Sequence, residues 1–330
     1  MNDLLSNLLR NADPGSVKRG DPLSEHGRRE LAKYEAQEAA LTHSSRRRST
    51  FSVRRLWRPL PLATSGALLV LLIVSLFAVT SVLRPAPAIA LTPPLLELAS
   101  VPRVTPELLK EMENMRRNGS PPGSTIRAQS WALNTSIGED GAIESSVTEP
   151  QWSETTFLAD GSVHYRLVTA APFPGQNEDG LPEPGMVLVD EVFLPGDWDN
   201  PVEEEPPTEV KDVAKFLMGL TGEHTLTTGQ TIREISAIMS NTILSPEQEA
   251  ALIGHLSKLD GIKVSGSTTD RLGRAGIVFS STDRDPGQVE DRLILSPHSG
   301  QILAAETLYI GSDRTDITSP AVIDYTAWER

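Results

Sequence analysis

Hydrophobic and polar positions divide this chain into three parts. Residues 1–58 are mostly polar, and Pro59–Leu83 is a run of 25 positions without a charged residue. Beyond the run, short stretches with helical or alternating spacing of apolar residues follow one another. A bilayer core about 30 Å thick takes about 20 apolar residues as a helix. The pattern therefore predicts one transmembrane helix over residues 59–83.

Strand and helix periods come in blocks after the predicted span. Residues 84–123 are interpreted as a proline-rich stalk with a short helix that begins at Thr105. The predicted strands are Thr125–Ile137, Val147–Leu158, Ser162–Ala170, Met186–Phe193, Ile262–Ser267, Gly276–Ser281, Gln288–Leu295, Gln301–Ile310 and Ala321–Trp328. The predicted helices are Thr208–Leu220, Thr231–Leu244 and Pro246–Leu259. Strands, then helices, then strands are typical of an α+β fold. We expect residues 124–330 to form an antiparallel sheet with helices packed on one face.

Arginines determine the predicted orientation of the span. Those before it are Arg46, Arg47, Arg48, Arg54, Arg55 and Arg58, whereas only Arg84 follows it before Glu97. Lys and Arg near a span stay on the cytoplasmic side. We therefore expect a single-pass protein of the cell membrane, anchored in the lipid bilayer, with residues 1–58 in the cytoplasm and residues 84–330 outside. As an alternative role, the same arginines contact anionic lipid headgroups at the membrane surface.

Two processing signals are alternatives to an uncleaved signal-anchor. Ala88-Ile89-Ala90 resembles the cleavage site of a secretory signal, and Ser45–Phe51 loosely resembles a twin-arginine export signal. A secretory signal stands at the N-terminus and has an apolar region of about 7–15 residues. Here 58 residues precede a longer run. The pattern favours an anchored protein, with cleavage near Ala90 as the alternative.

Composition narrows the classes of function. The chain has no cysteine, which excludes disulfides, thiolate catalysis and cysteine-containing zinc sites. Residues 84–330 carry 18 Lys and Arg against 37 Asp and Glu, whereas residues 1–60 carry 12 against 7. An exterior part with a net charge of −19 argues against nucleic acid as its partner.

Motifs of catalysis and cofactor binding do not occur in the sequence. It contains no G-x-S-x-G, Walker, G-x-G-x-x-G, H-E-x-x-H or EF-hand motif, and its six histidines are scattered. We expect no enzyme activity, no cofactor and no metal. The acidic run Asp197–Glu205 is interpreted as a solvated loop, with a calcium site as the alternative. The Arg271–Gly276 turn is the first surface feature to mutate, although a hairpin turn that needs glycine also explains it.

Four stretches carry a resemblance to a known family: Leu244–Leu252, Leu259–Val264, Thr269–Ile277 and Leu293–Leu303. They resemble an uncharacterised family of actinobacterial single-pass membrane proteins, commonly encoded beside extracytoplasmic-function sigma factors. The resemblance implies a basic cytoplasmic arm, a span and an α+β domain outside. The family has an aspartate before proline in a D-P-x-T-G motif near its end, where Ser296 stands here.

A second resemblance concerns the strands around the turn Asp160-Gly161. This meander is similar to the lipoprotein-carrier fold, which periplasmic regulators of anti-sigma factors share. The resemblance implies acyl chains held between a curved sheet and its helices. It concerns the fold alone, so it bears on function by analogy.

Two functional hypotheses follow. The first is a membrane-anchored regulatory or sensor protein, whose outer domain binds an envelope signal. Its arm, residues 1–58, is partly helical or disordered and meets a cytoplasmic sigma or anti-sigma factor. The second is a protein that binds a lipid or another hydrophobic ligand outside the membrane. An envelope protein that only tethers others is a plainer third alternative.

Overall fold

The computed structural model describes residues 89–137, 143–176 and 181–330. None of the helices in these ranges has the length and apolar character needed to cross a membrane. The predicted span over residues 59–83, the arm and all six arginines that orient the span lie outside the described residues. The topology, the domain bounds and the location in the membrane therefore stay predictions.

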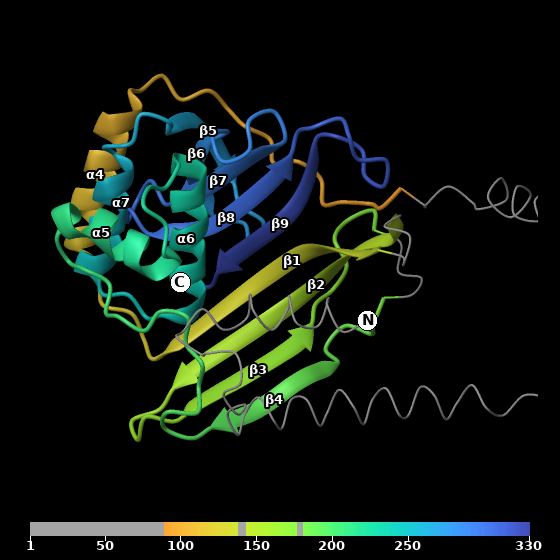
Figure 1. Ribbon diagram of the computed structural model, residues 1–330, viewed down its shortest axis with the longest axis horizontal. Coiled ribbons are helices and arrows are strands. Elements are labelled where there is room, and N and C mark those ends of the chain that lie inside the picture. The colour runs from red at the N-terminus through yellow and green to blue at the C-terminus, as the bar shows by residue number, and fades with distance from the viewer. Residues whose placement is uncertain (1–88, 138–142, 177–180) are drawn as a thin grey trace, which may run out of the picture. The chain divides into compact units, whose positions relative to one another are not determined.

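Nine antiparallel strands form one sheet in the order β4-β3-β2-β1-β9-β8-β7-β6-β5 (Figure 1). They are β1 Thr125–Ile137, β2 Ile143–Phe157, β3 Val163–Thr169, β4 Val187–Phe193, β5 Lys263–Thr269, β6 Ala275–Ser281, β7 Val289–Leu295, β8 Ile302–Tyr309 and β9 Ala321–Trp328. The chain lays down β1–β4 from the middle of the sheet outward. After the helices it lays down β5–β9 from the other edge inward, so that β9 pairs with β1.

Helices cover one face of the sheet on the side of β5–β9, which confirms the predicted α+β fold (Figure 1). They are α4 Thr105–Arg117, α5 Val210–Thr221, α6 Thr228–Asn241 and α7 Pro246–Leu256. The helix α4, within the stretch predicted to be a stalk, packs against α7. Capping boxes begin α6, at Thr227 and Gln230, and α7, at Ser245 and Gln248, because each pair satisfies two backbone N–H groups at the helix start.

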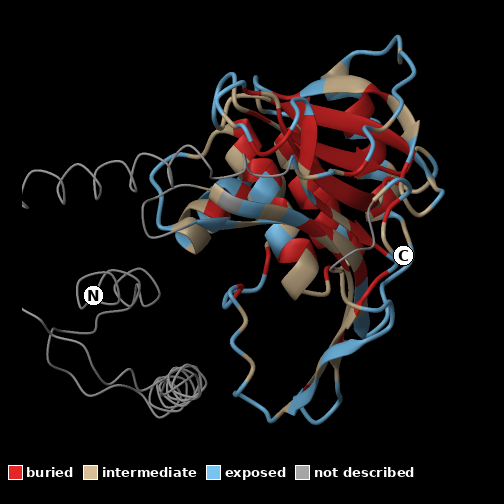
Figure 2. Cartoon of the chain, turned by 90° about the vertical axis from the view of Figure 1, so that its right-hand side faces the viewer, coloured by how far each residue is buried: buried red, intermediate tan, exposed pale blue. Residues whose placement is uncertain are grey.

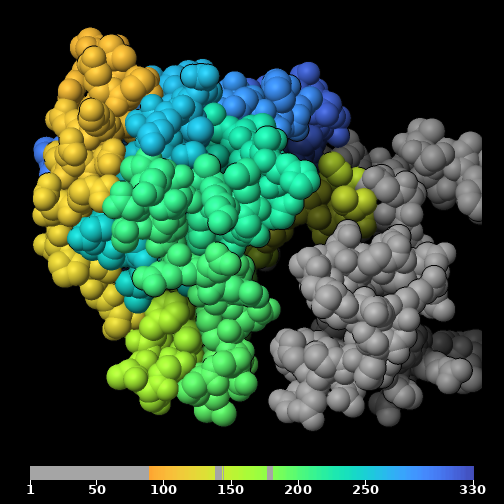
Figure 3. All heavy atoms as spheres, turned by 60° about the vertical axis from the view of Figure 1, so that its left-hand side comes forward, coloured from red at the N-terminus to blue at the C-terminus, as the bar shows by residue number. Residues whose placement is uncertain are grey.

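The main core lies between the helices and the sheet. It includes side chains with no exposed surface from α5, α6, α7, β6 and β7, namely Leu217, Ile235, Leu252, Phe279 and Leu293. Figure 2 shows that burial is concentrated in the part that the helices cover. Figure 3 shows the helical face, with the hairpin of β2 and β3 and the chain after β4 extending below it.

The opposite face of the sheet is covered as well. Trp131 of β1 stacks on Tyr325 of β9 with ring centroids 5.0 Å apart, and Phe173 meets the edge of Trp131. Leu96 and Leu272 pack against the same cluster. Strands such as β8, in which every residue is buried, therefore have no solvent-facing side.

Candidate functional site

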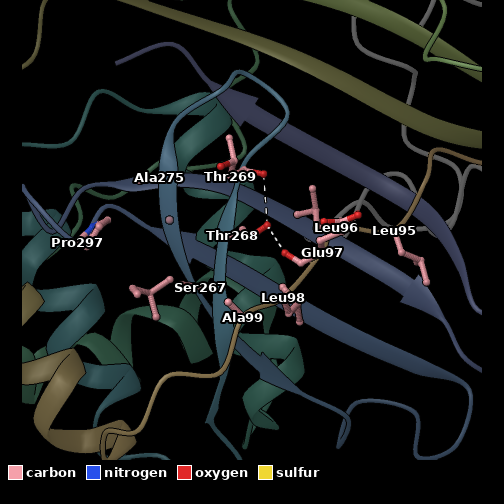
Figure 4. Close-up of a pocket in the computed structure, with 12 residues that line it drawn as sticks. Leu95, Leu96, Glu97, Leu98, Ala99, Ser267, Thr268, Thr269, Ala275 and Pro297 are labelled. Carbon is pink, nitrogen blue, oxygen red and sulfur yellow. Dashed lines mark hydrogen bonds between the residues drawn. The ribbon is translucent and has the colours of Figure 1, made fainter.

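A groove of about 690 Å³ opens beside the outer strand β5 (Figure 4). One wall is the extended segment Leu95–Ala99. The other wall consists of Ser267–Thr269 of β5, Ala275–Ile277 of β6 and Pro297. We call residues 89–99, which run to this groove from the N-terminal side, the strap. The groove is within the size range of small-molecule sites, roughly 300–1,000 Å³.

A few hydrogen bonds attach the strap to the domain. Ala99 pairs with Ser267 in antiparallel fashion, through N–H···O=C bonds of 2.9 and 2.8 Å. Thr268 Oγ1 donates to the carbonyl oxygen of Glu97 at 2.8 Å (Figure 4). Farther back, the N–H of Ala90 donates to the carbonyl oxygen of Asp316 at 2.7 Å. The strap thus caps the edge of β5 without a continuous ladder.

Gly266 is the residue that permits this close approach. Its φ is +155°, and a Cβ at this position would lie 2.7 Å from the carbonyl oxygen of Ala99. A side chain would therefore push the strap away from β5. Glycine inside a strand often marks such an approach of a second backbone.

Apolar and small side chains dominate the lining of the groove. Leucines and small residues line it, and Glu97 is the one titratable residue of its lining within the described part of the chain. Leu95 and Leu98 are partly exposed beside it, which favours an elongated apolar ligand with polar contacts to Ser267, Thr268 and Thr269.

Asp316 anchors the early part of the strap. The Arg314 guanidinium donates to the Asp316 carboxylate from Nε at 3.0 Å and from Nη2 at 2.5 Å. Ser146 Oγ donates to the same carboxylate. The Arg314 hydrogen bond, followed by that of Ser146, lowers the pKa of Asp316 to about 2 against the penalty of burial. A charged Asp316 thus fixes the loop whose backbone receives Ala90.

The predicted Arg271–Gly276 turn is present, with Gly273 at φ +80°, but its arginines point inward. Arg271 donates to Glu306 at 2.6 Å and stacks over the rings of Trp131 and Tyr325. Burial raises the pKa of Tyr325, and a nearby carboxylate raises it further. The interpretation as a hairpin turn that needs glycine is confirmed, whereas Arg271 faces the aromatic cluster of the sheet and not the solvent.

A second buried charge cluster joins α4 and α7 to the C-terminus. The Glu249 carboxylate accepts from Arg116 Nε at 2.6 Å, from Arg330 Nη1 at 2.5 Å and from the N–H of Ile302 at 2.7 Å. Glu249 and Arg116 have almost no exposed surface. Each partner is satisfied by fixed groups of the fold, so the cluster is structural.

The remaining candidate residues do not gather. His255 is half-buried, and burial, followed by the Lys258 charge, lowers the pKa of its imidazole. The acidic side chains of Asp197, Asp199 and Glu203–Glu205 are exposed. Among the residues that the structure describes, no group of three His, Asp or Glu is placed to hold a metal ion.

The space between sheet and helices differs from what the lipoprotein-carrier resemblance implies. Closely packed side chains fill it, and two pockets at its margins measure about 240 and 280 Å³. Both are smaller than typical ligand sites. The groove is not among the sequence predictions, because residues 84–123 are interpreted there as a proline-rich stalk. The spacing of Leu96 and Leu98 on either side of Glu97 is the signal that was available.

Comparisons with known proteins give a distant likeness only. No family model and no curated protein matches this chain. The solved structure of MucB is 12% identical over 67% of this chain and 56% of that chain, with a TM-score of 0.26. The complex of MucA and MucB from Pseudomonas aeruginosa gives 13% identity, 68% and 55% coverage and a TM-score of 0.25.

A domain of a lipoprotein-sorting protein from Vibrio parahaemolyticus is 10% identical over 68% of this chain and 90% of that chain, with a TM-score of 0.19. The chain spans about half the length of the MucB chains that it matches. Neighbours of these kinds agree with the resemblance to the lipoprotein-carrier fold seen in the sequence. At such TM-scores the superpositions carry no argument about function.

Proposed function

We propose that this chain is a non-enzymatic, membrane-anchored regulatory protein whose domain outside the membrane binds a ligand in the strap groove. The observation that carries the proposal is the position of the groove wall in the chain. Only residues 84–94 separate the predicted span from Leu95, the first residue of the groove wall. A ligand in the groove therefore contacts the segment that leads to the anchor.

Ligand binding changes the state of the anchor only if the ligand prefers one position of the strap. The hydrogen bonds of Ala90, Glu97 and Ala99 hold the strap against the domain. A ligand that fits the closed groove stabilises this attached state, whereas one that displaces the leucines releases the strap. Either change alters the length of free chain between the domain and the span. In the proposal, the arm of residues 1–58 transmits that change to a sigma or anti-sigma factor.

Co-purification tests the regulatory role. The full chain is isolated from native membranes in mild detergent, beside a variant that lacks residues 1–45, and bound proteins are identified by mass spectrometry. We expect a sigma or anti-sigma factor with the full chain and its loss from the variant. Recovery of envelope proteins alone, unchanged by the deletion, would contradict the role of the arm.

The second candidate function is carriage or sensing of a lipid or another hydrophobic ligand. The exposed leucines of the groove favour it. A photoreactive fatty acid is added to the full chain in membranes, and labelled peptides are mapped. Leu95→Ser is compared with Leu158→Ser, because both leucines are 43% exposed and only Leu95 lines the groove. We expect Leu95→Ser alone to reduce labelling. Equal labelling of both variants and the parent would exclude the groove as the lipid site.

A further inference from the structure

The two edges of the sheet differ in whether another segment of the described chain pairs with them. At one edge, the strap pairs with β5 through Ala99 and Ser267. At the other edge stands β4, and no strand within residues 89–137, 143–176 and 181–330 pairs with its outer side. Unpaired edges invite pairing with another chain, so natural proteins usually shorten, charge or cover them.

Backbone groups of β4 point away from the sheet. The N–H of Ala170 donates to Pro150 of β2, so alternate residues of β3, including Arg166, face β2 and the residues between them face β4. The register pairs Tyr165 with Glu191 and Val163 with Phe193. The N–H and C=O groups of Asp190 and Val192 therefore point outward, where an added strand would find them.

The same edge exposes an unusual amount of apolar side chain. Five large residues in the nine positions from 186 to 194 are between 41% and 65% exposed, namely Met186, Val187, Leu188, Val192 and Leu194. Single exposed apolar residues are common on protein surfaces, but several of them along one edge strand favour an interaction site. Free backbone groups and apolar side chains together are the two features that strand addition uses.

We propose that β4 is a docking strand for an extended peptide segment of another protein, in which apolar residues alternate with basic ones. The basic residues follow from charge. Glu191, on one face of the strand, is exposed, whereas Asp190, on the other face, already pairs with His164 Nε2 at 2.7 Å and with Arg166 Nε at 3.6 Å. Asp197 and Asp199 follow shortly after the strand and are exposed as well. Opposite charges across a strand pair stabilise it, and like charges destabilise it.

A second copy of this chain fits the edge poorly. A two-fold axis through the middle of an antiparallel β4–β4 pair would place Asp190 or Glu191 opposite its own counterpart. The exterior part of the chain also carries a net charge of −19, from 18 basic and 37 acidic residues, so two copies repel each other. The occupant is therefore a different, basic chain.

The test uses the full chain in nanodiscs of neutral phosphatidylcholine, because anionic lipids would bind a basic probe themselves. A fluorescent peptide that alternates valine and lysine is titrated, with a matched valine–glutamate peptide and empty nanodiscs as controls. We expect the lysine peptide to bind about tenfold more tightly than the glutamate peptide, with an affinity that falls at high salt. Equal binding of the two peptides would overturn the proposal.

Three substitutions, at Val192 and Glu191, locate the binding on β4. Val192→Pro removes an outward N–H that an edge strand can lose without disturbing its pairing with β3, and should weaken binding about tenfold. Val192→Thr keeps the N–H and should bind as the parent does. Glu191→Lys, a charge reversal at an exposed position, should reduce the preference for the lysine peptide. Unchanged binding by Val192→Pro, or an unchanged preference in Glu191→Lys, would overturn the proposal.

A fourth variant distinguishes the foreign chain from a second copy. The parent has no cysteine, so Val192→Cys introduces a single thiol at the edge. We expect the oxidised variant to stay monomeric in membranes. Rapid formation of a disulfide-linked dimer that no longer binds the lysine peptide would identify a second copy of this chain as the occupant. That result would overturn the proposal of a different, basic partner.

Discussion

The two halves of the sheet contain similar residues in opposite surroundings. Around β5–β9, helices cover one face, aromatic residues and the strap cover the other, and ion pairs such as Arg116–Glu249 are buried. Around β2–β4, ion pairs such as Arg127–Glu154 are exposed, and the edge strand is open within the described part of the chain. Charged side chains in the first half form buried ion pairs that hold it together. In the second half they form exposed ion pairs, so its surface stays available for contacts. The groove lies beside β5, at the outer edge of the covered half.

The strongest test of this contrast is Glu249→Gln. The variant keeps the shape of the side chain but leaves Arg116, which is 1% exposed, with an uncompensated charge. Breaking a buried ion pair from one side destabilises a protein by about 3–5 kcal/mol. Urea unfolding of the full chain in detergent, followed by tryptophan fluorescence, measures the loss. A change below about 1 kcal/mol would show that the cluster is not structural.

Asp316→Asn tests the anchor of the strap through pH. The folded pKa of about 2 lies below the ordinary value of 3.8. The carboxylate therefore contributes stability that is fully present above about pH 4 and is lost as the pH falls towards 2. The shift corresponds to about 2 kcal/mol at pH 7. The difference in unfolding free energy between parent and variant should shrink as pH falls from 4 to 2. A difference that is independent of pH would contradict the assigned charge.

Gly266→Ala tests the attachment of the strap locally. The added Cβ meets the Ala99 carbonyl, so the pairing of Ala99 with Ser267 should open more often. We expect amide hydrogen exchange to rise about tenfold at these two residues with little change in the helices. Gly219→Ala, in α5, is the control because a Cβ there meets nothing within 4 Å. Equal exchange in both variants would mean that the close approach does not hold the strap.

Glu154→Gln, the same substitution in the open half, should have the smallest effect. Glu154 is 3.7 Å from Arg127, and both side chains are largely exposed. Exposed pairs contribute about 0–1 kcal/mol, and salt screens them. Urea unfolding at low and high salt is the measurement. A loss as large as that of Glu249→Gln would remove the contrast between the halves.

Local patterns were sufficient for the elements of the domain. Each observed strand and helix in the described ranges has a predicted counterpart, and α7 begins at Pro246, as predicted. Apolar periodicity and helix caps depend on residues a few positions apart, so both can be recognised in a single sequence. Bounds moved where tertiary contacts extend an element. The helix α6, for example, begins at Thr228 rather than Thr231, where the N–H groups of Thr228 and Gly229 donate to the Asp283 carboxylate.

The candidate site depended on contacts that no local pattern contains. Thr268 donates a hydrogen bond to Glu97, which lies 171 positions earlier in the chain. Arg116 donates to Glu249, which lies 133 positions later. The sequence alone therefore determined the elements, the α+β class, the net charge and the candidate anchor. Only the tertiary structure decided that the strap caps β5, that Arg271 points inward and that β4 stays exposed. The chemistry of a side chain is local, whereas its exposure is decided by distant segments, and exposure determines the strength of a charge pair and the availability of a surface.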